Sequence, residues 1–221
     1  MAFGTIYSYP HNPRVSKIRA VANINGLTIK DGEFIFHTTN KTPEFLSKFP
    51  LGKAPVFESA DGVNLFESNA IAHYIAESGP AKDQLLGTTP AERASIQQWA
   101  TFSETEVANH VVTAFLPRFG LVPYNEETDN KAIANIERVL GALERHLDGK
   151  TWLATSEKLS FADIAVASAL VWGFMFSVDA EMRAKYPVVV AWWKRVTESE
   201  SVKEAFGETK FIKKREIPAK K

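Results

Sequence analysis

The sequence has no cysteine, no excess of either charge and no long apolar run among its 221 residues. Without cysteine it has no disulfide, no thiolate nucleophile and no cysteine-based zinc site. Its 26 basic and 26 acidic residues cancel, which argues against the broad positive field of a nucleic-acid-binding protein. No apolar run approaches the roughly 18 residues of a membrane span, and the N-terminus does not resemble a signal peptide. We therefore predict a cytoplasmic protein that binds neither nucleic acid nor membrane.

Metal and nucleotide sites also lack support in the sequence. The five histidines show no spacing that resembles a metal site, and no glycine-rich phosphate-binding loop is present. We expect no bound metal and no nucleotide. The chain is 45% hydrophobic and 24% charged, which is typical of folded proteins, and its length favours two packed units over one.

The first 80 residues show strand and helix patterns in alternation. In order, the patterns predict a strand over 5–9, a helix over 15–24, a strand over 32–37, a short helix over 42–49, strands over 54–59 and 64–66, and a helix over 69–78. The first βαβ crossover requires a parallel pair of strands, and the hairpin around Asp61-Gly62 requires an antiparallel pair. The order β-α-β-α-β-β-α therefore predicts a mixed sheet.

Strand patterns disappear after Gly79-Pro80. Helical patterns cover residues 90–115, 129–147, 161–176, 187–199 and 202–207. We therefore predict an α/β domain over 1–80, a linker over 81–84, an all-helical domain over 85–208 and a basic tail over 209–221. A basic run of this kind is typical of a solvated linker.

A capping signal precedes the most apolar of these helices. Ser160 and Asp163 have the spacing of a capping box, with Asp in the place of the more usual Glu or Gln. Leu159 and Ile164 are placed to form a hydrophobic staple around it. We interpret this motif as structural, since it fixes the start of a buried helix and needs no ligand.

A possible peptide-binding site appears around Pro55. A proline at the start of a strand cannot donate to the sheet, and a cis bond before it would leave the backbone of Val56 open to pair with a peptide-like ligand. Glu67 and Ser68 lie between the last strand and the next helix, whose N-terminus favours a carboxylate. Glu67 can bind the ammonium group of the same ligand. These residues predict a site for a small peptide with a free amino-acid end.

The combination resembles the glutathione transferases, and it covers nearly the whole chain. The resemblance implies a thioredoxin-like N-terminal domain followed by an all-helical domain. Within this superfamily the sequence most resembles the transferase-like domain of the gamma subunit of eukaryotic translation elongation factor 1B. The stretches that carry the resemblance are GTIYSYPHNPR, TNKTPEFLSKFPLGKAPVFE, DGVNLFESNAIAHYI, LSFADI, AWWKRV and GETKFIKKREIPAKK.

The resemblance implies glutathione as co-substrate, without a separate cofactor. It makes Pro55 the family's cis-proline, Val56 the residue whose backbone pairs with the cysteinyl part of glutathione, and Glu67 with Ser68 the clamp for the γ-glutamyl part. Two lysines are further candidates. Lys53 matches a position that is often basic or an amide in relatives, and Lys41 is a candidate for the glycyl carboxylate. The alternative for each lysine is a solvated surface charge.

A transferase must hold the glutathione thiol as a thiolate, which requires a hydrogen-bond donor just after the first strand. His11 or Asn12 lies where serine-type relatives keep their hydroxyl, and Tyr7 or Tyr9 where tyrosine-type relatives keep theirs. We expect Asn12 to take this role, and Tyr9 next. In the alternative interpretation Tyr7 is a core strand residue and Asn12 belongs to a turn.

Aromatic residues of the helical half are candidates for the walls of a second, apolar substrate pocket. These are Trp99, Phe102, Phe115 and Phe119, although aromatic residues at helical spacing are more often core residues.

Two functions from different classes follow from the resemblance. The first is an enzyme that conjugates glutathione to small electrophiles. The second is a non-catalytic scaffold of the elongation factor 1 complex that binds its nucleotide-exchange subunit. Homodimerisation is implied by the superfamily. Since one fold hosts several functions, the fold alone does not choose between them.

Overall fold

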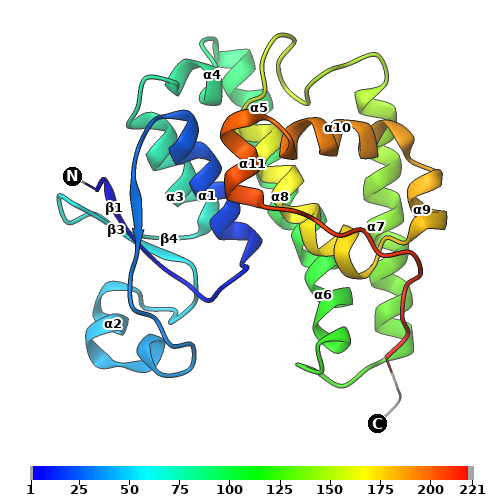
Figure 1. Ribbon diagram of the computed structural model, residues 1–221, viewed down its shortest axis with the longest axis horizontal. Coiled ribbons are helices and arrows are strands. Elements are labelled where there is room, and N and C mark those ends of the chain that lie inside the picture. Colours follow the sequence, from blue (N-terminus) through cyan, green and yellow to red (C-terminus); the bar gives the residue numbers. More distant parts are fainter. Residues whose placement is uncertain (1, 219–221) are drawn as a thin grey trace.

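A four-stranded mixed sheet organises the N-terminal half of the computed structural model, which describes residues 2–218 (Figure 1). Strand β1 (Gly4–Tyr7) pairs in parallel with β2 (Ile29–Asp31) and antiparallel with β3 (Val56–Ser59). Strand β4 (Asn64–Phe66) pairs antiparallel with β3, so that the order is β2-β1-β3-β4. The predicted mixed sheet is confirmed.

Helices pack this sheet against the rest of the molecule. Helix α1 (Pro13–Ile24) crosses from β1 to β2 and contacts both α3 (Ser68–Glu77) and helices of the C-terminal half. The short helices η1 (Thr39–Lys41) and α2 (Pro43–Lys48) connect β2 to β3. In Figure 1 the strands lie on the left and the helical half on the right, with α1 between them. Helix α1 is therefore the element that joins the two halves.

The strand predicted over residues 32–37 is wrong, because β2 lies just before this segment and ends at Asp31. Its neighbour β1 ends at Tyr7, and the Gly32 N–H makes the last bond, to the Ile6 carbonyl, at 2.8 Å. Beyond that point no strand remains for the apolar run to pair with. Ile35 and Phe36 are 66% and 42% exposed, and they belong to a loop rather than to the sheet.

The C-terminal half is helical throughout its described part. Its elements are α4 (Lys82–Leu86), α5 (Pro90–Phe102), the π-helical segment η2 (Ser103–Ala108), α6 (Asn109–Arg118), α7 (Glu126–Leu147), α8 (Phe161–Phe176), α9 (Ala180–Ala184), α10 (Pro187–Thr197) and α11 (Glu200–Phe206). The helix expected over 90–115 is thus two α-helices joined by η2, and α4 occupies most of the segment predicted as a linker. In residues 2–218 we find no helix with both the length and the apolar character needed to cross a bilayer.

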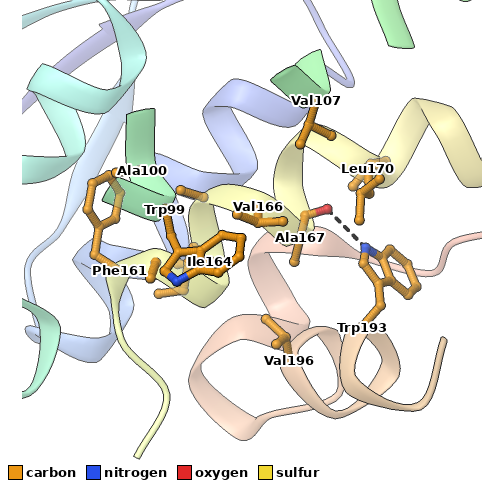
Figure 2. Close-up of a cluster of buried hydrophobic side chains, with 14 of the residues drawn as sticks. Trp99, Ala100, Val107, Phe161, Ile164, Val166, Ala167, Leu170, Trp193 and Val196 are labelled. Carbon is orange, nitrogen blue, oxygen red and sulfur yellow. Dashed lines mark hydrogen bonds between the residues drawn. The ribbon is translucent and has the colours of Figure 1, made fainter. Parts of the chain in front are cut away.

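Helix α8 is the centre of the helical half. Most of its side chains are buried, and Figure 2 shows Ile164, Val166 and Leu170 inside a cluster contributed by neighbouring helices. The indole N–H of Trp193 donates to the Ala167 carbonyl at 2.9 Å, which satisfies the one polar atom of a large buried side chain. Burial of an apolar side chain contributes roughly 1.5–3 kcal/mol, so this cluster is a main source of stability.

The predicted cap of α8 is present and extends further than the motif implies. The Asp163 carboxylate accepts from the N–H and the hydroxyl of Ser160 at 2.9 and 3.1 Å. Its other oxygen accepts from the Leu153 N–H and from the Trp192 indole, each at 2.9 Å. Asp163 is fully buried, and this burial raises the pKa of its carboxyl although the hydrogen bonds oppose the shift. One carboxylate therefore joins the start of α8 to α10 and to the loop before α8.

Residues 211–215 of the C-terminal segment are docked on the helical half, so the expectation of a solvated linker is wrong for them, whereas Glu216 and Ile217 are exposed. The Phe211 ring lies 5.2 Å from the ring of Phe174 and 5.4 Å from that of Trp193. The Ile212 N–H donates to the Phe174 carbonyl at 3.3 Å. Lysines 210, 213 and 214 remain exposed, whereas Phe211 and Ile212 between them are partly buried. The basic composition of the segment therefore did not indicate these apolar contacts. Residues 219–221 of the predicted tail lie outside the described residues.

Candidate functional site

The predicted peptide site is a cleft at the carboxyl end of β1 and the start of β3. The Ala54–Pro55 peptide bond is cis, and Val56 is the first residue of β3. Because β3 lies between β1 and β4, the backbone exposed to the cleft is the end of an interior strand rather than the edge of the sheet. The cleft holds about 310 Å³, which is within the usual range for a small-molecule site.

Six of the eight residues predicted for the site line this one cleft. They are Tyr9, Lys53, Pro55, Val56, Glu67 and Ser68. Two do not line it: Asn12 is buried beneath it, and Lys41 is exposed outside it. The six come from three segments of the chain, and the fold brings them together.

Glu67 and Ser68 form the entry to helix α3. Glu67 has φ 67°, a left-handed conformation that is uncommon for a side chain of this kind and is found where the surrounding structure requires it. Its side chain makes no cap bond to the helix. Ser68 is the first residue of α3 and is 4% exposed. This arrangement presents a helix N-terminus and an exposed carboxylate to the same cleft, which suits the two charges of an amino-acid end.

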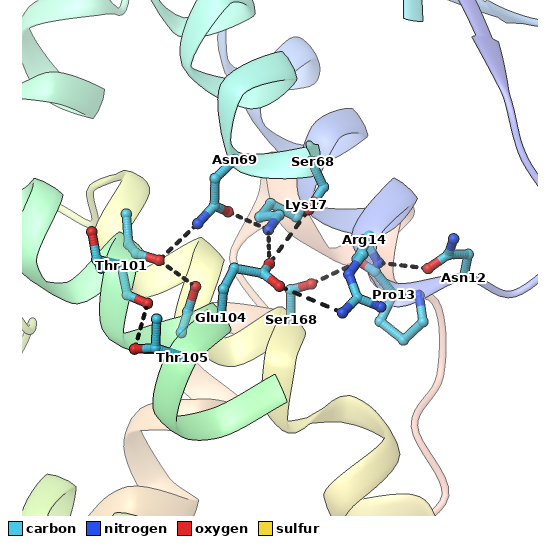
Figure 3. A network of polar contacts seen from close by, with 12 residues as sticks. Asn12, Pro13, Arg14, Lys17, Ser68, Asn69, Thr101, Glu104, Thr105 and Ser168 are labelled. Atoms are coloured by element: carbon cyan, nitrogen blue, oxygen red, sulfur yellow. Dashed lines mark hydrogen bonds and ion pairs between the residues drawn. The ribbon is translucent and has the colours of Figure 1, made fainter. Parts of the chain in front are cut away.

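Three charged residues that the sequence did not suggest lie behind this entry (Figure 3). The Lys17 ammonium is 2.9 Å from one Glu104 oxygen, and the Arg14 guanidinium is 3.4 Å from the other. The Ser68 hydroxyl donates to the first oxygen at 3.4 Å. Burial raises the pKa of Glu104, but Lys17 and Arg14 outweigh it and hold the pKa below its usual range. Glu104 is therefore an ionised carboxylate at neutral pH.

Lys17 also contacts helix α3. Its ammonium donates to the amide oxygen of Asn69, whose NH₂ group donates to the Ala100 carbonyl at 2.7 Å. The Lys17 side chain is 1% exposed, and this burial lowers the pKa of the ammonium while Glu104 opposes the shift. The one signal in the sequence for this cluster is a set of charged residues inside helical patterns, and most such residues lie at the surface.

The candidates for the thiol-binding donor are separated by the structure. Asn12 caps helix α1: its amide oxygen accepts from the Arg14 N–H and its NH₂ group donates to the Ser8 hydroxyl, each at 3.1 Å. It is 2% exposed. Tyr9 lines the cleft, and burial raises the pKa of its hydroxyl against the opposing effect of Arg14. The Tyr9 hydroxyl therefore stays protonated at neutral pH and can donate.

The other two candidates lie away from the cleft. Tyr7 is a strand residue whose ring stands edge-on to Phe45, with 6.5 Å between ring centres. His11 is exposed in the turn before α1, with φ 58°. Neither residue lines the cleft.

A second, smaller pocket adjoins the cleft between α1, η2, α6 and α8. Its apolar walls are Pro13, Ala108, Val111, Val112, Ala169 and Trp172. Arg14 and Glu104 line both the cleft and this pocket, so they mark the junction between the two. The second pocket holds only about 20 Å³, which is room for a water-sized group, so it is a small apolar recess beside the cleft.

The aromatic candidates of the helical half divide into two groups. The Phe115 ring stacks on Trp172 at 4.2 Å, and Phe119 lies 4.3 Å from Phe115, so these rings support Trp172 but do not line the second pocket themselves. Trp99 instead packs on the His146 ring at 4.5 Å and on Phe102, away from this pocket.

Comparisons with known proteins agree with this architecture. Residues 2–77 match the family model for the glutathione S-transferase N-terminal domain, and residues 104–200 match that for the C-terminal domain. Over 210 residues the chain is 48% identical to glutathione S-transferase-like protein LUC7 of Fusarium sp, covering 95% of each chain.

Similarity to a second kind of protein is also present. The chain is 38% identical over 218 residues to elongation factor 1-gamma-A of Xenopus laevis, covering 97% of this chain and 49% of that one. It thus spans about half the length of that relative. The fold is similar to the GST-like domain of elongation factor 1-gamma from Saccharomyces cerevisiae, with a TM-score of 0.84, 27% identity and coverage of 99% and 100%.

Proposed function

The chain belongs to the glutathione S-transferase family, and from this premise we propose that it binds glutathione in the cleft and conjugates it to small apolar electrophiles. One observation carries the proposal: the same cleft is lined by the start of β3 at Val56, by the N-terminus of α3 at Glu67 and Ser68, and by Arg14 at the junction with the second pocket. The fungal transferase-like relative supports the proposal, because this chain matches it over nearly its full length.

We propose one orientation of glutathione in which its charged ends and backbone meet these groups. Its γ-glutamyl carboxylate binds at the N-terminus of α3 and Ser68, and the ammonium group binds Glu67. The backbone of Val56 pairs with the cysteinyl residue. The glycyl carboxylate then extends towards Lys53, and the thiol points to the junction that Arg14 and Glu104 form with the second pocket.

The reaction needs the thiol without its proton. The thiol proton passes to solvent, and the thiolate sulfur forms a bond to an electrophilic carbon while the leaving group, or the opened ring or double bond, takes the electron pair. The Tyr9 hydroxyl is the donor that lines the cleft, and a hydrogen bond to the thiolate lowers the thiol pKa. Arg14 adds a positive charge at the same place. Asn12 acts indirectly, because it caps the helix that carries Arg14.

The part of the electrophile that reaches the small second pocket is apolar in this proposal. The second pocket offers aliphatic and aromatic walls and no charged side chain apart from Arg14 and Glu104 at its junction with the cleft. A substrate with a charged group remote from its reacting carbon would be desolvated there without a partner.

A second candidate function is a scaffold in the elongation factor 1 complex. The similarity to elongation factor 1-gamma supports it, and we propose the nucleotide-exchange subunit as the partner in that case. We also propose that the protein acts in the cytoplasm and forms a homodimer. A scaffold can retain a ligand site, so the two functions are compatible.

Calorimetric titration of glutathione tests the main proposal. Wild type should bind, and Glu67→Ala/Ser68→Ala should bind at least tenfold more weakly, because each lost bond to a charged group is worth about 1.5–3 kcal/mol. The matched control is Glu44→Ala/Ser47→Ala, which changes the same residue types on α2 outside the cleft and should bind as wild type does. Conjugation of a general electrophile is measured in parallel.

Failure of wild type to bind glutathione would exclude the enzyme and leave the scaffold. Co-purification with the exchange subunit tests the scaffold separately, and retention of that partner by Ser68→Ala would show that it does not use the ligand cleft.

A further inference from the structure

Lys17 is a buried cation at a position where an apolar side chain would pack as well. It lies on the inner face of α1 and is 1% exposed. Replacing buried ion pairs by apolar residues of similar volume is often neutral or stabilising, because charged groups lose their hydration on burial. Packing alone therefore gives no reason for an ammonium group here.

The groups around Lys17 link it to the proposed site. Its ammonium faces the carboxylates of Glu104 and Glu67, the amide oxygen of Asn69 and, along its own helix, the guanidinium of Arg14. Glu104 lies in η2, and π-helical segments are frequent at functional sites. Lys17 thus contacts the carboxylate that lines both pockets, but it lines neither pocket itself.

We propose that Lys17 is a positioning residue that neutralises Glu104, so that the positive charge of Arg14 remains available to the glutathione thiolate. This inference rests on the proposed function. Glu104 has one oxygen on Lys17 at 2.9 Å and the other on Arg14 at the longer distance of 3.4 Å. With Glu67 paired to the ammonium group of glutathione as proposed above, Lys17, Arg14 and Glu104 leave a net positive charge at the junction. Without Lys17, Glu104 and Arg14 cancel.

The charge balance predicts opposite effects for the two partners. Lys17→Met removes a positive charge, destabilises the thiolate and raises the thiol pKa of bound glutathione by about one unit, or tenfold in the ionisation constant. Glu104→Gln removes a negative charge and lowers the same pKa. In Lys17→Met/Glu104→Gln the changes offset one another, and the thiol pKa returns towards the wild-type value. A purely structural role for Lys17 does not produce shifts of opposite sign.

The experiment measures the ultraviolet absorbance of the thiolate against pH for glutathione bound to each variant. Calorimetry first establishes binding at a fixed pH, and circular dichroism establishes folding. Arg19→Met is the matched control. It removes a cation from the same helix, and this cation pairs with Asp31 and not with Glu104. It should leave the thiol pKa unchanged. If Lys17→Met does not fold, the comparison of Lys17→Met/Glu104→Gln with Glu104→Gln isolates the Lys17 charge, because the double variant buries no unpaired charge: the thiol pKa should be higher in the double variant, and equal values would refute the proposal.

The outcomes separate this inference from the function on which it rests. If wild type binds glutathione and the thiol pKa of Lys17→Met differs no more than that of Arg19→Met, the role of Lys17 is refuted and the proposed function stands. A rise of the thiol pKa in Glu104→Gln would equally refute it. If wild type binds no glutathione, both proposals fail.

Discussion

Two carboxylates of the helical half have different surroundings: Asp163 joins helical elements to one another, and Glu104 bonds to α1 and α3 of the N-terminal half. Asp163 is fully enclosed and accepts from four neutral donors, at the start of α8. Glu104 is about one-third exposed, faces two cations and lines both pockets. The neutral donors around Asp163 stabilise the fold and leave no charge exposed to a ligand. The cations beside Glu104 lie at an open cleft, where a ligand can interact with them, so this second arrangement is suited to binding.

The two sites also differ in the sign of their pH dependence. Burial raises the pKa of Asp163, so its contribution to stability is fully present below about 3.9, the pKa of the unfolded state, and is lost as pH rises through the folded-state value. Lys17 and Arg14, which outweigh burial, lower the pKa of Glu104. Its contribution is therefore present above about 4.3 and is lost as pH falls through the lowered value.

The largest expected effect comes from Asp163→Ala. This change leaves the N–H of Leu153, the indole N–H of Trp192 and the donors of Ser160 buried without an acceptor. We expect a loss of about 3–5 kcal/mol in the free energy of unfolding, measured by urea denaturation at neutral pH. Asp83→Ala, at an exposed position of helix α4, is the control and should change stability by less than about 0.5 kcal/mol.

A loss close to that of the control would mean that the Asp163 site does not organise α8. The Asp163→Asn variant keeps the shape of the side chain and removes its titration. Its stability relative to wild type should improve as pH rises from acid to neutral, since wild type loses the contribution of Asp163 over that range.

Glu104→Gln has the next largest effect. It removes the carboxylate that is bonded to the buried ammonium of Lys17 and leaves the more distant Glu67, and we expect a loss of about 2 kcal/mol at neutral pH, discounted from a fully buried pair because Glu104 is partly open to solvent. The difference from wild type should shrink as pH falls below about 4.3, as the wild-type carboxylate takes up its proton. A difference that grows in acid would contradict the assignment of the cations as its cause.

The contrast explains what could be read from the sequence. The cap of α8 was predictable because Ser160 and Asp163 lie three residues apart, and such a motif is local. The bonds from Glu104 to Arg14 and Lys17 join residues 90 and 87 positions apart, and no local pattern encodes them. The strands and helices were also predictable, because hydrophobic periodicity is a pattern among residues that are near one another in the sequence.

The proposed ligand site lies between these extremes. Pro55, Glu67 and Ser68 were chosen from short motifs at element boundaries, and they line one cleft. The sequence does not separate Asn12 from Tyr9 as the thiol donor, because it does not show which side chain lines the cleft. An asparagine before a helix is typical of a helix cap and can also be a hydrogen-bond donor to a thiolate. The strand expected over 32–37 failed for a related reason, because the length of β1 decides where β2 ends.

A smaller effect tests one donor of the closed site. Ser160→Ala removes the hydroxyl that donates to Asp163 at 3.1 Å but keeps the backbone donor at 2.9 Å. We expect a loss of about 1 kcal/mol by urea denaturation, which is typical of an N-cap substitution. Ser47→Ala, on the exposed α2, is the control. A loss equal to that of Asp163→Ala would show that the hydroxyl, and not the carboxylate, holds the site.

The smallest effect concerns Glu106, which lies in η2 two residues after Glu104 and faces away from the cleft. Its carboxylate pairs with Arg138 at 2.6 Å, but the two side chains are 39% and 61% exposed. Glu106→Gln should therefore cost less than about 0.5 kcal/mol at low salt and nothing measurable in high salt, because solvent and ions screen an exposed pair. It should also leave the thiol pKa of bound glutathione unchanged. If Glu106→Gln lowered the free energy of unfolding as much as Glu104→Gln does, the loss would depend only on removing a partner of a cation. Burial of the Glu104 pair would then not explain its larger expected effect.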